Sequence, residues 1–371
     1  MGMIGGGEVA FIGAIHRSAA AIDGKIDLVA GAFSQNEEKS ISFGRALGLA
    51  DDRCYGSYQQ MIKAESSLPK DQRIDFVTIV TPNNSHYEIS KYALKNGFHV
   101  FCEKPATMTL NESLELQSVL NATDRVYGLA HTYSAYPMIL EARSRVARGD
   151  IGKIFKVMVD YTQGWLAPEY IDETQKQASW RLNPDQSGIS CCMGDIGVHG
   201  ANLAEFITTE RINHVLADLS SLNDRLLDDD GTVLLKFSNG VKGSLSASQV
   251  CVGEENNLTI RIYGENGSLK WQQQEPNTLL MQQANEPVQI LRNGGDYLSE
   301  STKAFSRTPS GHPQGYIEAF ANLYQQFTQQ LTRQVTISTL PSIEQAIAGM
   351  AFIEAVVESN RQGNQWVKLS A

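Results

Sequence analysis

Two short stretches of this 371-residue sequence carry side chains suited to acid-base chemistry and charge stabilisation. The first is Glu103-Lys104-Pro105, which follows a strand-like run at 98–102. Proline donates no hydrogen bond to a sheet and restricts the residue before it, so the strand should stop at Lys104. The amine would then lie at the carboxyl end of the strand, the edge at which open α/β sheets bind ligands.

The second stretch contains Asp195, His199 and Asn202, at i, i+4 and i+7. On a helix this spacing gives one polar stripe. Three glycines form the neighbouring face, where a flat ligand or another backbone can come close: Gly194, Gly197 and Gly200. A histidine with a pKa near ~6.5 can accept a proton at neutral pH, which makes His199 the candidate general base. A lone histidine is more often structural, but the aspartate one turn earlier favours function.

A glycine-rich loop near the N-terminus points to a nucleotide. Gly5, Gly7 and Ala10 fit the pattern G-x-G-x-x-A, between a short strand at 1–4 and a helix through 18–21. The glycines allow a tight turn and close approach of a pyrophosphate, and the small third residue lets helix and strand pack. Glycine-rich turns are common, so the argument depends on this strand-turn-helix context.

The second strand, at 26–33, ends at Ser34, where a ribose-binding carboxylate would be expected. A serine does not repel a 2′-phosphate, and Asn36 and Lys39 could contact one. An ordinary helix start at Ser34 with a solvated Lys39 explains the same residues equally well. The sequence therefore leaves NAD versus NADP open.

The elements that must position these residues change in type along the chain. A nearly continuous apolar strand at 74–80, a helix at 87–96 and the strand before Lys104 form a parallel unit, as in a doubly wound Rossmann sheet. Later segments read as an antiparallel meander, two helices and a closing strand, at 232–237, 241–248, 257–263, 268–271, 316–332, 342–360 and 366–369. We therefore predict an α/β chain with a dinucleotide-binding domain at 1–131, followed by an α+β substrate and oligomerisation domain at 132–371.

Charge and cysteine content narrow the partners. A net charge of −10 without a Lys/Arg stripe argues against nucleic acid and anionic membranes. The five cysteines lack a CxxC pair, so we expect neither a disulfide framework nor a metal site. No apolar run reaches the roughly 18 residues of a membrane span. These features favour a cytoplasmic protein with a small ligand or a nucleotide as partner.

Taken together, these motifs resemble the glucose-fructose oxidoreductase/inositol dehydrogenase/MocA-type oxidoreductases (Gfo/Idh/MocA). The resemblance covers nearly the whole chain and depends most on Glu103-Lys104-Pro105 and Asp195-x-Gly197-x-His199. A subgroup with a Gly-Gly-Gly loop followed by Ala-Phe-Ile-Gly is most similar. Asn202 replaces a second aspartate of many relatives, and Ser34 replaces the cofactor-discriminating acid.

The resemblance implies a set of site residues. NAD or NADP would be bound by residues of four loops and the turns after them: Gly5, Gly7, Ala10, Phe11, Ile12, Ser34, Lys39, Thr81, Pro82, Asn83, His86, Glu103 and Lys104. Substrate would contact Lys104, His131, Tyr133, Trp165, Trp180, Arg181, Asp195, His199, Asn202 and His312. Trp180 could equally be a core residue, and His312 could equally serve the structure of its loop. Lys104, Asp195 and His199 would be catalytic. The Lys104-Pro105 bond is expected to be cis, as it often is in this family.

The function implied is oxidation of a secondary hydroxyl of a sugar, anhydrosugar or inositol-like polyol. His199 would take the hydroxyl proton and Lys104 would stabilise the alkoxide while a hydride passes to nicotinamide C4. Two alternatives stay open: an NAD-dependent glycoside-cleaving enzyme with a retained cofactor, and a non-catalytic NAD(P)-sensing protein. An open sheet with an apolar face needs cover, so a homodimer or homotetramer through the C-terminal sheet is expected.

Overall fold

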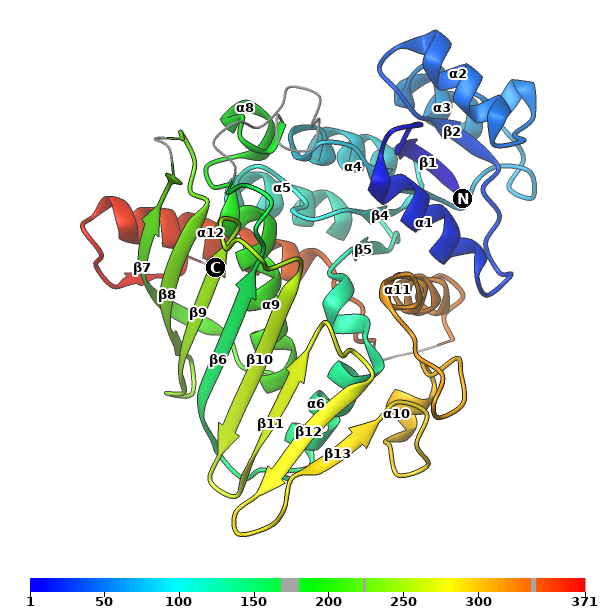
Figure 1. Cartoon of the computed structure of the whole chain (residues 1–371). Helices are drawn as coiled ribbons and strands as arrows, with labels where there is room; N and C mark the ends of the chain where they lie inside the picture. The colour runs from blue at the N-terminus through cyan, green and yellow to red at the C-terminus, as the bar shows by residue number, and fades with distance from the viewer. Residues whose placement is uncertain (168–179, 223–224, 335–337, 371) are drawn as a thin grey trace. The chain divides into compact units, whose positions relative to one another are not determined.

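The computed structural model describes residues 1–167, 180–222, 225–334 and 338–370 and divides into two compact units (Figure 1). The first comprises Met1–Thr132 and Tyr316–Ile347, and the second comprises Tyr133–Gly315 and Ala348–Ala371. Residues 316–347 thus belong with the first unit, whereas the sequence placed them in the second domain. None of the helices in the described ranges is long and apolar enough to cross a membrane.

The first unit is built on a five-stranded sheet of order β2-β1-β3-β4-β5, in which every pairing is parallel. The chain starts in the middle of the sheet, so the strand order reverses between β1 and β3, where open α/β sheets bind ligands. The bounds are β1 (Gly2–Gly5), α1 (Phe11–Ala21), β2 (Ala30–Ala32), α2 (Glu37–Ala46), α3 (Tyr58–Ser66), β3 (Phe76–Val80), α4 (His86–Lys95), β4 (His99–Cys102), α5 (Leu110–Asn121), β5 (Tyr127–Leu129) and α11 (Tyr316–Leu331). The expected Rossmann sheet is confirmed.

Helix α11 completes the first unit by packing against α1. Its aromatic side chains Phe320, Tyr324 and Phe327 are fully buried and contact His16 of α1 and Phe101 of β4. No local pattern reveals this return of the chain, because the amphipathic helix predicted at 316–332 could cover either sheet.

The second unit contains a nine-stranded sheet of order β13-β12-β11-β10-β6-β9-β8-β7-β14. Only β6 and β9 pair in parallel, so the large, mostly antiparallel sheet is confirmed. The strands are β6 (Ile154–Thr162), β7 (Ile212–Ser220), β8 (Asp230–Phe237), β9 (Lys242–Ser248), β10 (Asn257–Gly264), β11 (Gly267–Gln272), β12 (Thr278–Gln283), β13 (Gln289–Arg292) and β14 (Val367–Lys368). The helices are α6 (Pro137–Ala147), α8 (Pro184–Ser187), α9 (Val198–Thr208), α10 (Glu300–Lys303) and α12 (Ile343–Arg361), which begins in the first unit.

One face of this sheet is covered by helices. Helix α9 packs on β6 and β10, and α6 packs on β11 and β12. Along β8, Val233, Leu235 and Phe237 are buried on this side, whereas Leu234 and Lys236 between them are exposed. This period-two alternation is typical of a sheet with one covered face and one solvated face.

Candidate active site

The loop between β1 and α1 has the tight backbone expected of a dinucleotide site. Gly5 and Gly6 have φ of 83° and 70°, which side chains other than glycine rarely adopt. A Cβ on Gly13 would lie 2.4 Å from the Gly6 Cα, so this glycine, in the first turn of α1, lets helix and loop come together. The sequence had assigned that packing role to Ala10, which instead precedes the helix as its N-cap. The loop leads into an 11-residue helix whose N-terminus suits a pyrophosphate.

Three loops meet at the carboxyl edge of the parallel sheet. A Cβ on Gly5 would lie 2.7 Å from the Thr81 side chain and 2.9 Å from the Val80 carbonyl, so the glycine loop adjoins the end of β3. The backbone N–H of Glu103 donates to the Ile79 carbonyl at 2.9 Å, which places the end of β4 beside the same strand. The loops predicted to bind the cofactor and the loop that carries the amine therefore share one edge.

Ser34, just after β2, stands where a ribose-binding carboxylate was expected, and its hydroxyl takes part in local hydrogen bonding. The Ser34 hydroxyl accepts the N–H of Asn36 at 3.1 Å, and the Asn36 side chain caps α2 by accepting the N–H of Lys39 at 2.9 Å. Lys39 itself is exposed. A helix does start in this segment, but at Glu37 with Asn36 as its N-cap rather than at Ser34. Contact of Ser34, Asn36 or Lys39 with a 2′-phosphate stays a prediction.

Two large apolar side chains next to the glycine loop are exposed to solvent. Val9 and Phe11 are 71% and 64% exposed, although Phe11 begins α1 and Ile12 beside it is half-buried. Exposed large apolar groups at a helix N-terminus that could bind a pyrophosphate suit a ligand with flat apolar rings, as a dinucleotide has.

The Glu103-Lys104-Pro105 segment is held by side chains from other elements. Its Lys104-Pro105 bond is cis, which confirms the prediction. One Glu103 carboxylate oxygen lies 2.8 Å from Nε2 of His16, and the other accepts the backbone N–H of Lys104 at 3.1 Å. Nδ1 of the same, fully buried His16 lies 2.8 Å from the Tyr324 hydroxyl. The Glu103 carboxylate therefore has protein partners on both oxygens, and its predicted role in cofactor binding has no direct support in these contacts.

His16 and Tyr324 were missed from the sequence. Neither lies in a motif, and each sits among apolar residues of an amphipathic helix, where the ordinary interpretation is core packing. The contacts of His16 with Tyr324 and Glu103 form only when folding brings α1, α11 and the end of β4 together.

His131 follows β5 and is 1% exposed. Burial, together with the positive charge of Lys104, lowers its pKa to about 3. The imidazole is therefore neutral at physiological pH and does not compete with Lys104 as a cation.

In the second unit, Asp195 lies in a π-helical turn, Met193–Gly197, that leads directly into α9. π-helical turns are rare and often occur at functional sites. One carboxylate oxygen of Asp195 accepts from Nε of Arg181 at 3.1 Å and from the Gln249 amide at 3.0 Å. The expected helix is thus present, but Asp195 lies in a π-helical turn before it. The i, i+4 spacing had assumed a regular α-helix from Asp195 to His199.

The start of this helical segment is fixed by Asp228. Its carboxylate accepts the backbone N–H groups of Cys191 and Met193 and the hydroxyl of Ser190, all at 3.0 Å. Its own carbonyl accepts the N–H of Cys192, also at 3.0 Å. Burial raises the pKa of Asp228, and these hydrogen bonds partly offset that rise. Consecutive N–H groups at a helix start need such acceptors, so Asp228 positions the turn that carries Asp195.

Asp228 and Gln249 were not predicted as site residues. Asp228 belongs to an Asp-Asp-Asp run that reads as a solvated turn, and Gln249 follows a strand of small residues. Gln249 is nevertheless fully buried, and its carbonyl oxygen accepts from the Cys191 thiol at 3.4 Å while its amide reaches Asp195.

His199 lies in the first turn of α9 and is 7% exposed. The ring of Tyr133 packs edge-on against it, with centroids 4.9 Å apart. The Tyr133 hydroxyl lies 2.6 Å from that of Tyr161 and accepts from the Asn256 amide at 3.1 Å. The predicted base is therefore packed against an aromatic ring that is itself fixed by two hydrogen bonds.

The glycines of this segment have different surroundings from those expected. A Cβ on Gly200 would lie 3.0 Å from both Leu245 of β9 and Val159 of β6, so the close approach there is between helix and sheet. A Cβ on Gly197 would lie 2.6 Å from the Met193 sulfur, whereas one on Gly194 would meet nothing within 4 Å. The idea that all three form one face for a flat ligand is therefore wrong, and only Gly194 borders open space.

The remaining predicted substrate residues divide into two groups. The guanidinium of Arg181 lies 4.4 Å from the ring centre of Trp180 and 5.9 Å from that of Trp165, so both tryptophans join the Asp195 cluster. Half-buried Asn202 lies further along α9, and exposed His312 lies in the turn after Pro309, whose carbonyl accepts its N–H at 3.1 Å. The structure places neither of these two in contact with the cluster.

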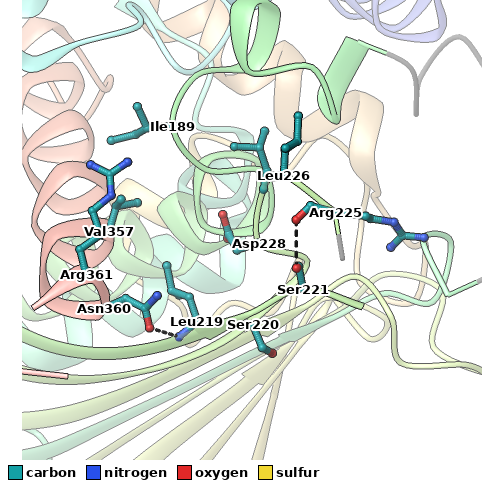
Figure 2. A pocket seen from close by; sticks show the side chains of 11 residues that line it. Ile189, Leu219, Ser220, Ser221, Arg225, Leu226, Asp228, Val357, Asn360 and Arg361 are labelled. Atoms are coloured by element: carbon teal, nitrogen blue, oxygen red, sulfur yellow. Dashed lines mark hydrogen bonds between the residues drawn. The ribbon is translucent and has the colours of Figure 1, made fainter. Parts of the chain in front are cut away.

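A pocket of about 230 Å³ lies in the second unit between the β7–β8 connection and α12 (Figure 2). Its lining includes Leu219, Ser221, Arg225, Asp228 and Arg361. Figure 2 shows the Asn360 side chain bonded to Leu219 and the Ser221 side chain bonded to Arg225, so part of its polar surface is already paired. None of the predicted site residues lines it.

Comparisons with known proteins agree with this arrangement. Residues 1–131 match the model of the oxidoreductase family with an NAD-binding Rossmann fold, and residues 139–270 match the GFO/IDH/MocA C-terminal domain. An uncharacterized oxidoreductase of Bacillus subtilis, YfiI, is 33% identical over 99% of this chain and 95% of its own length. A levoglucosan dehydrogenase of Pseudarthrobacter phenanthrenivorans is 29% identical over 55% of this chain and 56% of its length.

A solved structure is similar over almost the whole fold. The crystal structure of an inositol dehydrogenase homolog from Azotobacter vinelandii, complexed with NADH and myo-inositol, has a TM-score of 0.92 and 32% identity and covers 99% of this chain and 96% of the other. With both halves of the chain matched and relatives above 30% identity along its length, this protein belongs to the Gfo/Idh/MocA family of NAD(P)-dependent oxidoreductases.

Proposed function

We propose that this enzyme oxidises a secondary hydroxyl of a sugar, anhydrosugar or inositol-like polyol. The observation that supports this most is the similarity, over 99% of the chain, to a protein crystallised with NADH and myo-inositol. The levoglucosan dehydrogenase among its relatives extends the candidate substrates to anhydrosugars. All of these are compact neutral rings with several hydroxyl groups.

The residues of the first unit suit a dinucleotide. The contacts of Gly6 with Gly13, and of Gly7 with the Phe33 carbonyl, leave no space for side chains, as a loop closely approached by a pyrophosphate requires. We propose that Gly5, Gly7 and the start of α1 hold the phosphates, and that Ser34 and the Thr81–Asn83 turn flank the remainder. The bound nicotinamide ring would supply the hydride acceptor.

The protein's own groups would manage charge and protons. We propose that the Lys104 amine, delivered at the edge of the parallel sheet, stabilises the negative charge that develops on the substrate oxygen. His199 would accept the hydroxyl proton, because a histidine can do so near neutral pH. The edge-on Tyr133 ring limits rotation of the imidazole, and Asp195, held by Arg181 and Gln249, would orient a neighbouring hydroxyl.

The test is a panel assay. Purified enzyme would be mixed with NAD or NADP and with inositols, sugars, levoglucosan and simple glycosides, and the absorbance of reduced cofactor would be followed. We expect turnover with at least one polyol, and loss of about 10² or more in kcat for Lys104→Ala and for His199→Ala. Cofactor binding without turnover of any member would contradict the proposal, and release of an aglycone without net cofactor reduction would identify the glycoside-cleaving alternative.

We also propose a homo-oligomer through the solvated face of the nine-stranded sheet. Exposed apolar side chains lie at both ends of one cross-strand row of this face, since Leu234 is 45% exposed and Ile290 is 55% exposed. Between them the strand registers place Ser244, Met158, Arg261, Lys270 and Leu280, so the row combines apolar and charged groups. A second copy of the same face would cover them. Light scattering of the wild type and of Leu234→Asp tests this, with a dimer or tetramer expected for the first and a smaller species for the second. A monomeric wild type would contradict it.

A further inference from the structure

His86 is the first residue of α4 and is 1% exposed. Its Nδ1 lies 2.7 Å from the carbonyl oxygen of Pro105, and its Nε2 lies 2.8 Å from the carbonyl oxygen of Thr81. Both distances are those of good hydrogen bonds. The sequence had placed this imidazole at the cofactor, but each ring nitrogen already has a backbone partner.

The chemistry of these partners determines the protonation state of the ring. A carbonyl oxygen can only accept a hydrogen bond, so each of the two bonds needs an N–H on the histidine. A neutral imidazole has one N–H, whereas an imidazolium has two. The two contacts can therefore be satisfied together only by the charged ring.

The surroundings support a buried charge. Burial alone would lower the pKa of His86, but the Cys102 thiol and the carbonyls of Pro105 and Thr81 raise it to about 9. The ionisable groups around the ring are that thiol, on β4, and beside it the phenol of Tyr127, on β5. Burial raises the pKa of Tyr127 well above its ordinary value, so the phenol stays neutral and contributes no charge beside the ring.

The two carbonyls belong to the loop after β3, which is proposed to flank the cofactor, and to the loop after β4, which carries Lys104. Thr81 opens the turn after β3, and Pro105 follows Lys104. Both loops contain a proline, which has no N–H, so each backbone offers one hydrogen-bond donor fewer. An N–H on each ring nitrogen of His86 would satisfy one carbonyl of each loop.

We propose that His86 is a positioning residue which, as a permanent imidazolium, ties the Thr81–Asn83 turn to the Lys104-Pro105 segment. This rests on the proposed function for the importance of the two loops, but not for the charge of the ring. In this role His86 contacts neither cofactor nor substrate and acts through the position of Lys104 and of the cofactor turn.

Neutron diffraction from crystals of the NAD complex, exchanged into deuterium oxide at about pH 8, tests the charge directly. We expect deuterium on both ring nitrogens of His86. His99 serves as the internal control, because its Nδ1 accepts the Val126 N–H at 2.8 Å and should carry no deuterium. A single deuterium on His86 would overturn the proposal. Since no turnover is measured, failure of the proposed polyol oxidation would leave this result intact.

Kinetics of two variants test the positioning role. His86→Gln keeps neutral donors and His86→Leu keeps none, so we expect kcat to fall about tenfold for the first and about a hundredfold for the second. His99→Gln, with its histidine on β4 of the same sheet, should keep wild-type kcat. Thermal unfolding of each variant confirms that it is folded. A rise in KM for the cofactor alone, with kcat unchanged in both variants, would instead indicate direct contact with the cofactor and overturn the positioning role.

Discussion

The ring of Tyr133 stands at 85° to the imidazole of His199, with 4.9 Å between their centres. Tyr133 is itself fixed through its hydroxyl, which lies 2.6 Å from that of Tyr161 and accepts from Asn256. Burial raises the pKa of the Tyr133 phenol, so it remains a neutral hydrogen-bonding group. The ring therefore serves as a wall for the proposed base rather than as a second acid or base.

This contact predicts different effects for two changes at one position. Tyr133→Phe keeps the edge-on ring and should lower kcat by no more than a few fold. Tyr133→Ala removes the wall and lets the imidazole rotate, so kcat should fall by about tenfold or more. Steady-state kinetics with the substrate found in the panel would measure both, and equal losses in the two variants would show that the hydroxyl, not the ring, matters.

The glycine loop gives a second prediction, which separates two nearby small residues. Gly13→Ala would place a methyl group 2.4 Å from the Gly6 Cα, so the helix and loop must move apart. We expect a loss of about 1–3 kcal/mol in the free energy of unfolding and weaker cofactor binding. Urea unfolding and fluorescence titration with NADH would measure the two effects.

Ala10→Ser is the matched control for this change. Ala10 is the N-cap of α1, a position that favours serine, so the variant should unfold at the same urea concentration as the wild type or a higher one. If Ala10→Ser proved as disruptive as Gly13→Ala, the close packing would lie at Ala10, as the sequence pattern suggested.

A third prediction concerns the start of the segment that carries Asp195. Asp228→Asn replaces one accepting oxygen by an amide donor that would face an N–H or a hydroxyl, so about 1–3 kcal/mol of stability should be lost. The activity should fall as well, because Asp228 no longer accepts both N–H groups that hold the turn at 193–197 in place. Urea unfolding and kcat would be compared with those of Asp230→Asn, two residues along the same run. The Asp230 carboxylate accepts a long hydrogen bond from the Ser220 hydroxyl, at 3.3 Å, and the Asp230→Asn variant should be close to wild type. Equal losses in both variants would contradict the anchoring role.

The parts of the fold with a local signal were predictable. The buried strand at β3, the helices α11 and α12 and the strands β8 to β11 follow from the apolar period, and the edge position of Lys104 follows from Pro105. β7, β12 and β13 were not predicted, because polar residues interrupt their alternation and their pairing partners are remote. The assignment of α11 to the first unit also depends on contacts with α1 that no local pattern encodes.

The candidate site likewise contains residues that the sequence reveals and residues that only the structure reveals. Lys104, Asp195 and His199 stand in motifs whose residue types suggest chemistry, whereas His16, Asp228 and Gln249 support them from remote segments. The groups that hold a motif in place have ordinary types and ordinary spacing, so only the folded chain reveals them. His86 illustrates the reverse case, since its motif suggested a ligand contact but its ring is bonded to two backbone carbonyls.

The fourth prediction is a pH dependence of stability that arises at His131. Its pKa is lowered to about 3 by burial and by the charge of Lys104, while the unfolded chain should titrate near ~6.5. Between these values the unfolded state binds more protons, so stability falls as the pH falls below about 6.5, by about 2 kcal/mol at about pH 5. His131→Asn removes this contribution of histidine protonation to the pH dependence of stability. Urea unfolding at about pH 7.5 and pH 5 should therefore show a smaller acid loss for His131→Asn than for the wild type, whereas exposed His312→Asn should match the wild type. An identical acid loss in all three proteins would show that His131 is not held neutral by burial.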